Sequence, residues 1–334
     1  MRKLRTILVW IAISLIVQCG VLFYLDQVYF KDNAKVNMKQ VDIKNDLEKL
    51  DKHPQIPTGA TNIKPSYDGK YLSYYDNGSL NVLDGNSGEI QNFDLVQSGT
   101  VLDSLWLSDR NVLLTLENVN GRIELYSYDA RKKQNEKMID ITYYSQYYKT
   151  FDIQSSPITG VTYVKVGGGI FRIDINQSHA EAVPITVKSV GSMDILPTKD
   201  RLVYIADGGS VIHMTQPAQR EVITGYGPLK IIGIDENDTV YLVQANNDKV
   251  SKILKKDLNS KSSKVETIDL GVSASLKDVF VKDNGSIYIN DSSKNEVKEI
   301  KSGKTFKYEG SFIGMYQSGI ASKKDNKLYR VPFN

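Results

Sequence analysis

The residues best suited to contact a partner form one aromatic run. Tyr143, Tyr144, Tyr147 and Tyr148 fall within six residues of one another. A tyrosine side chain buries a large area while ordering few torsions, and its hydroxyl adds a hydrogen bond. Because the four come as adjacent pairs, both faces of an extended segment are aromatic. Two interpretations stay open: a loop that presents the tyrosines to a protein or glycan, and a strand between two repeats packed on both sides.

Few residues of the sequence are candidates for binding a metal ion or for acting with a catalytic nucleophile. His53, His179 and His213 lie far apart, and none has a nucleophile or an orienting carboxylate beside it in the sequence. No two histidines have ligand spacing, and no segment has the form of an EF-hand loop. The single cysteine excludes an internal disulfide and a cysteine metal centre. We expect structural or solvated roles for the histidines and predict neither a metal nor a cofactor.

Hydrolase and phosphate-binding motifs are also missing. The chain has no Gly-x-Ser-x-Gly elbow, and the triple glycine at 167–169 precedes a strand-like segment, which indicates a hairpin turn. Acidic residues are scattered along the chain, and one sequence cannot pair them. An extracytoplasmic lyase or glycosidase with acidic residues in a central funnel is therefore the alternative to a non-catalytic binding protein.

The composition is that of a globular protein. The chain has 334 residues, 41% of them hydrophobic and 24% charged, with a formal charge of +3. Residues 1–30 hold three cations and one anion, so the rest of the chain is almost neutral. Nucleic-acid binding requires a surplus of Lys and Arg facing phosphates, and we predict no such partner.

The strongest local signal is a membrane segment at residues 7–25. These nineteen residues carry no charge and would span roughly 28 Å as a helix, close to the hydrocarbon thickness of a bilayer. Arg2, Lys3 and Arg5 precede them, so the positive-inside rule places residues 1–6 in the cytoplasm and the C-terminal domain outside. We predict a single-pass anchor in the cell membrane. A cleaved signal peptide and a lipid anchor at Cys19 are the alternatives, which the flanking residues fit less well.

Two regions follow the apolar segment. Residues 26–57 are polar, have a short stretch of helical spacing, and contain Pro54 and Pro57 at their end, which is typical of a juxtamembrane stalk. Residues 58–334 alternate short apolar strands with Asn-Gly and Asp-Gly turns such as Asn77-Gly78 and Asp84-Gly85. We find no convincing amphipathic helix beyond residue 60, so this domain is predicted to be all-β.

The strands recur with a period of roughly 40 residues. Each unit reads as an apolar strand, a polar turn, a strand with a central tyrosine, and a polar hairpin. The predicted units start near Ile63, Val101, Phe151, Val190, Leu229, Ala274 and Phe312. Such a repeat without a helix is typical of β-propeller blades. Seven blades fit best, with six or eight as alternatives.

The last unit holds too few residues for four strands. An unpaired strand edge would promote aggregation, and a propeller avoids it by pairing a strand from one terminus with the blade made by the other. We therefore predict that a strand within residues 54–62 completes the blade formed by residues 319–333.

The first unit resembles a known group of propellers. Residues 65–75, PSYDGKYLSYY, and residues 80–88, LNVLDGNSG, are similar to the unit SPDGKYLAY…LYVLDLETGE of WD40-like propellers of the TolB and dipeptidyl-peptidase N-terminal type. Residues 106–110 with 125–129 match in part, and the later units follow in pattern alone. The resemblance implies a fold for residues 60–334 and no particular function, because propellers host both binding and catalysis.

These observations favour a membrane-anchored, extracytoplasmic β-propeller that acts as a non-catalytic binding or scaffold module. Its predicted partner is a protein or a cell-envelope glycan, contacted by the four tyrosines. A sensor or assembly factor that requires another membrane subunit is a third hypothesis. The lack of disulfides in an exported domain, together with many Lys, Asn and Ile residues, fits a Gram-positive bacterium.

Overall fold

A computed structural model describes residues 2–24, 52–92, 99–245, 249–260 and 264–333. The chain divides into two compact units, Met1–Asp46 and Leu47–Asn334, which are treated separately. In the first unit, α1 comprises Arg2–Tyr24. Among the described residues, no helix has the length and apolar character needed to cross a membrane. Most of the predicted stalk, residues 26–51, lies outside the described residues.

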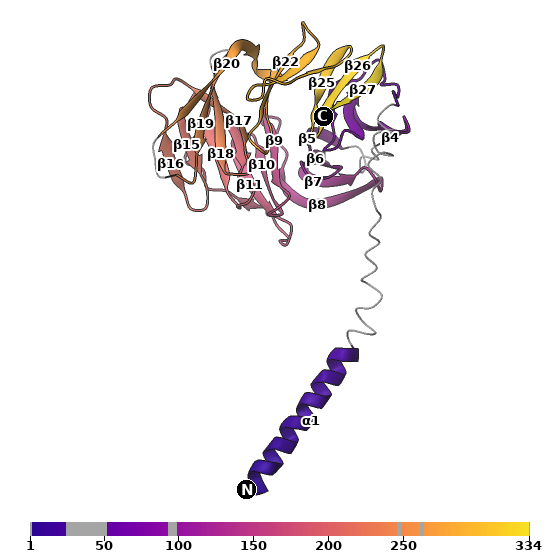
Figure 1. Ribbon diagram of the computed structural model, residues 1–334, viewed down its shortest axis with the longest axis vertical. Helices are drawn as coiled ribbons and strands as arrows, with labels where there is room; N and C mark the ends of the chain where they lie inside the picture. The colour runs from indigo at the N-terminus through magenta and orange to yellow at the C-terminus, as the bar shows by residue number, and fades with distance from the viewer. Residues whose placement is uncertain (1, 25–51, 93–98, 246–248, 261–263, 334) are drawn as a thin grey trace. The chain divides into compact units, whose positions relative to one another are not determined.

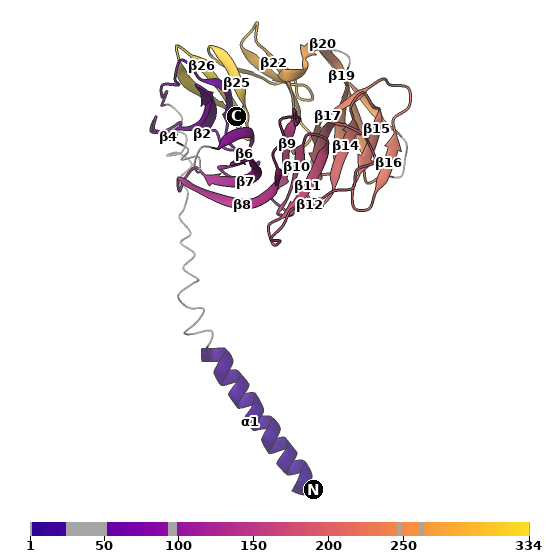
Figure 2. The ribbon, with the colours of Figure 1, turned by 180° about the vertical axis from the view of Figure 1, so that it is seen from behind.

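The second unit is a seven-bladed β-propeller of antiparallel sheets (Figures 1 and 2). Blade 1 is β1 (Thr61–Pro65), β2 (Tyr71–Asp76), β3 (Ser79–Asp84) and β4 (Ile90–Asn92). Blade 2 is β5 (Thr100–Trp106), β6 (Val112–Val119), β7 (Arg122–Asp129) and β8 (Gln134–Tyr143). Blade 3 is β9 (Phe151–Ser156), β10 (Val161–Val166), β11 (Gly169–Asp174) and β12 (Glu181–Ala182). Blade 4 is β13 (Val190–Ile195), β14 (Leu202–Ala206), β15 (Val211–Met214) and β16 (Gln219–Val222).

The other three blades follow in the same order. Blade 5 is β17 (Leu229–Ile234), β18 (Thr239–Gln244), β19 (Lys249–Asp257) and β20 (Glu266–Ser275). A 3₁₀ turn, η2 (Leu276–Asp278), leads into blade 6, which is β21 (Val279–Val281), β22 (Ile287–Asp291), β23 (Glu296–Glu299) and β24 (Thr305–Lys307). Blade 7 is β25 (Ser311–Tyr316), β26 (Gly319–Lys324) and β27 (Lys327–Pro332).

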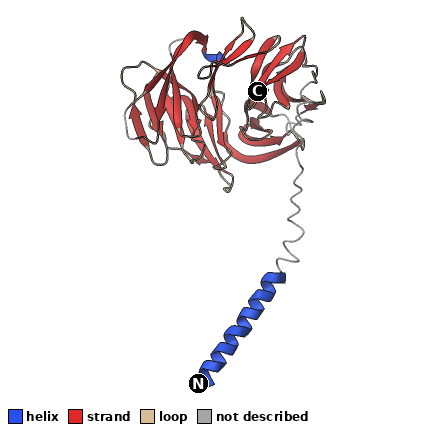
Figure 3. Ribbon diagram, viewed as in Figure 1, coloured by secondary structure: helices blue, strands red, loops and turns tan. Residues whose placement is uncertain are grey.

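Each blade is a meander in which the order of strands in the sheet equals their order in the chain. First strands of neighbouring blades contact one another, as in the pairs β1 with β25, β5 with β9 and β13 with β17. The first strands therefore surround the central channel, and the fourth strands form the perimeter. Beyond residue 60 the described residues contain no α-helix, which confirms the all-β prediction (Figure 3).

The hairpins form where the sequence can adopt left-handed backbone conformations. Asn77 and Gly78 have φ angles of +49° and +80°, and Asn120 and Gly121 have +51° and +80°. Positive φ at both central residues gives the turn type whose twist matches that of the flanking strands. These Asn-Gly pairs join the second and third strands of blades 1 and 2.

The core lies between blades because each sheet has two apolar faces. Along β6, Leu114 and Leu116 pack with Val164 of blade 3, whereas Leu113 packs on the other side with Val82 of blade 1. Strand side chains alternate between the two faces, so one strand serves two neighbours. A single blade cannot bury either face alone, which is why the sequence repeats.

The predicted unit starts are confirmed within two residues for six blades. The sixth differs: Ala274 lies in β20, and the first strand of blade 6 begins at Val279, after the η2 turn. The apolar alternation in this region continues through a ten-residue outer strand, so the pattern itself does not mark where blade 5 ends.

The ring is closed by the segment that precedes β1, as predicted. Gln55 forms an antiparallel bridge with Lys327, the Leu328 amide donates to the Pro54 carbonyl at 3.0 Å, and the Ile56 amide donates to the Asn326 carbonyl at 2.6 Å. Ile56 is fully buried beside Leu328. This short segment supplies the outer edge of the blade that β25, β26 and β27 begin.

His53 takes part in the same closure. Its Nδ1 lies 3.0 Å from the Leu328 carbonyl oxygen, and its ring stacks on Tyr329 with 4.0 Å between centroids. These contacts give His53 a structural role.

Candidate functional site

One mouth of the central channel is the candidate site. It is a hollow of about 520 Å³, formed by the loops that join the first strand to the second strand in all seven blades. Each blade contributes at least one lining residue, and these include Tyr67, Asp109, Ile158, Pro197, Glu236, Asp283 and Gln317. The propeller therefore brings together residues that span most of the chain.

Local hydrogen bonds hold these loops in shape. In blade 1 the Tyr71 amide donates to Ser66 Oγ at 3.1 Å, and the Lys70 amide donates to Asp68 Oδ1 at 3.0 Å. In blade 5 the Thr239 amide donates to Asp235 Oδ1 at 2.9 Å. Asp and Ser are common in such turns because a short side chain can accept hydrogen bonds from nearby amides.

Neighbouring loops are also bonded to each other. Asn111 Nδ2 donates to Asp68 Oδ2 at 3.0 Å, and the Glu236 amide donates to the Asp283 carbonyl at 2.7 Å. The Gln317 amide donates to the Tyr67 carbonyl at 2.9 Å, linking the last blade to the first. These bonds fix three pairs of neighbouring loops relative to each other at the rim of the mouth.

The mouth combines acidic and apolar side chains. Four carboxylates line it, from Asp109, Asp194, Glu236 and Asp283, and none of its described lining residues is Lys, Arg or His. Ile158 is 73% exposed at the rim. Single exposed apolar residues are common on protein surfaces. What sets Ile158 apart is its place at a hollow that all seven blades line.

Trp106 forms part of the floor. It is nearly buried, lies in the first strand of blade 2, and donates from Nε1 to Ser73 Oγ at 3.0 Å. Lys282 lines a smaller adjoining hollow. Its ammonium donates to the Tyr316 carbonyl, and burial lowers its pKa to about 8. This cation is therefore directed toward blade 7.

Asp103, Asp152 and Asp194 lie in the first strands of the consecutive blades 2, 3 and 4. Burial, together with smaller contributions from the charges of Asp152 and Asp283, raises the pKa of Asp194 to about 7. Burial likewise raises the pKa of Asp152 to about 6, with a contribution from the charge of Asp103. The channel therefore holds carboxyl groups that titrate near neutral pH.

Replacing Asp194 with asparagine is expected to reduce the pH dependence of stability. The folded protein holds the Asp194 proton to a higher pH than the unfolded chain does. Its contribution to stability is thus fully present below about pH 4 and is lost as the pH rises through 7, by roughly 2–4 kcal/mol. Chemical unfolding of the full chain between pH 4 and pH 8 measures this loss. The exposed Asp207→Asn is the control, and parallel curves for wild type and Asp194→Asn would contradict the prediction.

The four tyrosines that were predicted to contact a partner differ in their exposure in the structure. Tyr143, Tyr144 and Tyr147 are exposed by 69%, 38% and 80%, whereas Tyr148 packs in the core between blades 2 and 3. The Arg122 guanidinium lies 5.0 Å from the Tyr143 ring centroid. Three of the four therefore share a surface, and their role as partner contacts stays a prediction.

This tyrosine surface and the channel mouth lie at opposite ends of the sheets. Tyr143 ends β8, and Tyr144 and Tyr147 follow it in the connection from a fourth strand to the first strand of the next blade. Because antiparallel strands alternate in direction, that connection leaves the sheet at the end opposite the loop between its first and second strands. The two surfaces therefore cannot contact the same small ligand.

Neither a metal centre nor a histidine-based site emerges from the described residues. They contain no group of three or more His, Cys, Asp or Glu placed to hold a metal ion. His179 is exposed, and His213 is buried with its ring 5.1 Å from that of Tyr204. The residues of the mouth form no recognisable motif in the sequence. Their position directly after each first strand of the repeat is the signal that could have found them.

Comparisons with known proteins find structural similarity only. No protein-family model matches the chain, and no curated protein matches its sequence. Hsv2 of Kluyveromyces lactis with loop 6CD replaced by a Gly-Ser linker matches with a TM-score of 0.52 and 12% identity, over 81% of this chain and 89% of that one. Hsv2 of Kluyveromyces marxianus matches with a TM-score of 0.50 and 14% identity, over 81% and 90%. These matches support the β-propeller fold. The TolB type that the first repeat resembles stays a prediction.

Proposed function

We propose that this protein is a non-catalytic binding or scaffold module that docks a protein partner at the channel mouth. The observation that carries the proposal is the convergence of seven loops on one hollow with four carboxylates and an exposed Ile158. A partner that covers the mouth buries Ile158 at its rim, and the four carboxylates favour a partner surface that carries Lys or Arg. The β-propeller fold fits a binding or scaffold module.

We further propose that the propeller works outside the cell, tethered by the N-terminal segment. The support is in the sequence: residues 7–25 are uncharged, and Arg2, Lys3 and Arg5 precede them. The exposed Tyr143 and Tyr147, at the opposite end of the sheets, form a second contact surface for a protein or cell-envelope glycan. Such a tether keeps the propeller close to partners in the cell envelope, which is what a binding or scaffold module requires.

Substitution of Ile158 tests the docking proposal. A photoreactive amino acid placed at Ser108, on the rim, is expected to give a discrete protein adduct in intact cells that express the full chain. Ile158→Asn should lower the yield of this adduct about fivefold or more, because burial of an isoleucine side chain contributes roughly 1.5–3 kcal/mol. Quantitative blotting against the chain measures the yield.

Val222→Asn is the matched control, since Val222 is also an exposed aliphatic residue, 62% exposed, but lies on an outer strand. It should leave the adduct unchanged. Absence of an adduct from Ser108, or equal loss with both variants, would argue against docking at the mouth.

A second candidate function is acid–base catalysis in the channel. The raised pKa of Asp194, about 7, favours it, because a protonated carboxyl group near neutral pH can act as a general acid toward a glycan. Release of product from envelope glycans by the full chain, lost in Asp194→Asn, would favour this candidate over the binding module.

A further inference from the structure

A second hollow of about 520 Å³ lies between blades 3 and 4 and shares no lining residue with the mouth. One wall is the segment that begins with β12 and continues through Val183, Pro184 and Thr186. The other wall is the face of blade 4 that packs against blade 3. This volume lies within the range of small-molecule sites in proteins.

Three side chains form a row across the blade 4 wall. Tyr204 of β14 is paired in register with His213 of β15, and His213 is paired with Arg220 of β16. Residues paired in this way point to the same face of a sheet. Exposure increases along the row, from buried Tyr204 and His213 to exposed Arg220. The row therefore runs from the core between the blades to the perimeter of the ring.

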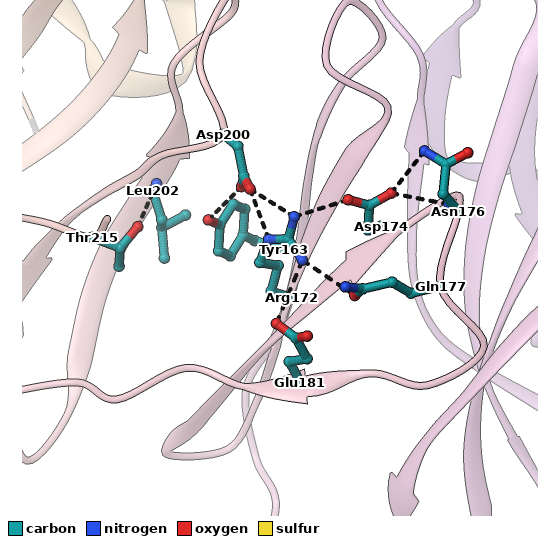
Figure 4. A network of polar contacts seen from close by, with 9 residues as sticks. All are labelled: Tyr163, Arg172, Asp174, Asn176, Gln177, Glu181, Asp200, Leu202 and Thr215. Carbon is teal, nitrogen blue, oxygen red and sulfur yellow. Dashed lines mark hydrogen bonds and ion pairs between the residues drawn. The ribbon is translucent and has the colours of Figure 1, made fainter. Parts of the chain in front are cut away.

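The second arginine at this cavity, Arg172, is already paired. Its guanidinium contacts Asp200 at 2.6 Å, Asp174 at 2.9 Å and Glu181 at 3.5 Å, and donates to Gln177 at 3.3 Å (Figure 4). Tyr163 also donates to Asp200, at 2.9 Å. Arg172 thus belongs to the contact between blades 3 and 4 and has no charge to offer a ligand.

Arg220 differs because its guanidinium forms no ion pair with any residue that the structure describes. Its neighbour Glu221 points to the opposite face, where it pairs with Lys256 at 3.0 Å. His213 lies beside Arg220 with its Nδ1 3.1 Å from Thr186 Oγ1. When Thr186 donates to Nδ1, the proton of a neutral His213 is on Nε2. Burial, and then the charge of Arg220, lower the pKa of His213, so the neutral ring predominates at pH 7.

We propose that this cavity binds a small monocarboxylate with an apolar body. The carboxylate pairs with Arg220, and the body lies against Val183, Pro184 and Ala218. A planar carboxylate matches the fork of a guanidinium, and a partly buried pair of this kind is stronger than one in open water. A ligand with two negative charges fits less well, since Glu181 and Asp200 lie close by and only one arginine is unpaired.

The test uses the full chain in lipid nanodiscs and the NMR signals of its histidine rings. His213 lines the cavity, and His53, which stacks on Tyr329 where the ring closes, is the internal reference. The probes are para-ethylbenzoate and its neutral amide. We expect the benzoate to shift the His213 signal saturably, with an affinity about tenfold higher than that of the amide, or 1.4 kcal/mol. The His53 signal should not move.

Arg220→Gln should abolish the preference for the carboxylate while leaving the affinity of the amide unchanged. Arg131→Gln, an exposed arginine of blade 2, is the matched control and should retain the preference. Ala218→Trp, which fills the cavity from an exposed turn, should abolish the His213 shift with both probes. An unresponsive His213 signal, equal affinities for the two probes, or an unchanged preference in Arg220→Gln would each overturn the proposal.

Discussion

Replacing Ile56 with alanine is expected to lower the free energy of unfolding of the propeller by about 2–5 kcal/mol. Ile56 is fully buried among Leu72, Leu83 and Leu328, so it joins the N-terminal end of the domain to blades 1 and 7. The loss combines the transfer free energy of the removed methyl groups with the cavity that they leave. Because Ile56 lies in the segment that closes the ring, its loss also weakens the edge of blade 7.

Chemical unfolding of the full-length chain, followed by tryptophan fluorescence, measures this effect. Gln55→Ala is a close control: Gln55 precedes Ile56 in the same closing segment, but its side chain is exposed. It should change stability by less than about 0.5 kcal/mol. If the two variants unfolded at the same denaturant concentration, the closing segment would not stabilise the ring.

Replacing Arg172 with methionine is expected to cost about 3 kcal/mol or more. The Arg172 guanidinium is 10% exposed and is shared by Asp174 of blade 3 and Asp200 of blade 4 (Figure 4). Methionine keeps the apolar stem but leaves the Asp200 carboxylate without its cation. Removing one member of a buried ion pair typically costs 3–5 kcal/mol for this reason.

Two further variants separate this effect from a general loss of charge. Arg131→Met removes an arginine that is 66% exposed and paired with Asp129 at 3.8 Å, and it should cost less than about 1 kcal/mol. Adding Asp200→Asn to Arg172→Met should recover part of the loss, because no uncompensated carboxylate then remains at that position. Equal destabilisation by Arg172→Met and Arg131→Met would show that the contact between blades 3 and 4 does not depend on this network.

The architecture of the propeller was predictable because its determinants are local. Short continuous runs of apolar residues specify strands with two buried faces, and pairs such as Asn77-Gly78 specify the turns between strands. The period of these signals placed six of the seven first strands within two residues. It failed at Ala274, where an outer strand and the following turn share one continuous pattern.

Ring closure was also predictable, for a different reason. The final repeat is too short for four strands, and the missing outer edge had to come from elsewhere in the chain. The structure places it at residues 54–56, within the predicted range. Counting the strands of each repeat is enough for this inference, because every blade needs four strands.

The candidate sites were not predictable from the sequence because they depend on distances between blades. Tyr67 and Gln317 are 250 positions apart in the chain, yet their backbones are bonded at the mouth. The effect of the Asp152 charge on the pKa of Asp194 exists only because their strands are neighbours around the channel.

The amino-acid sequence by itself determined that residues 58–334 form repeated sheets, because hydrophobic periodicity and turn chemistry act over a few residues. Only the tertiary structure decided which polar side chains face a common space. Tyr148 packs against the core between blades 2 and 3, whereas Tyr147 is exposed. Arg172 is paired with Asp200, whereas Arg220 forms no ion pair with the residues that the structure describes. The physical reason is that burial and charge pairing are set by the neighbouring blade, whose residues lie tens of positions away in the chain.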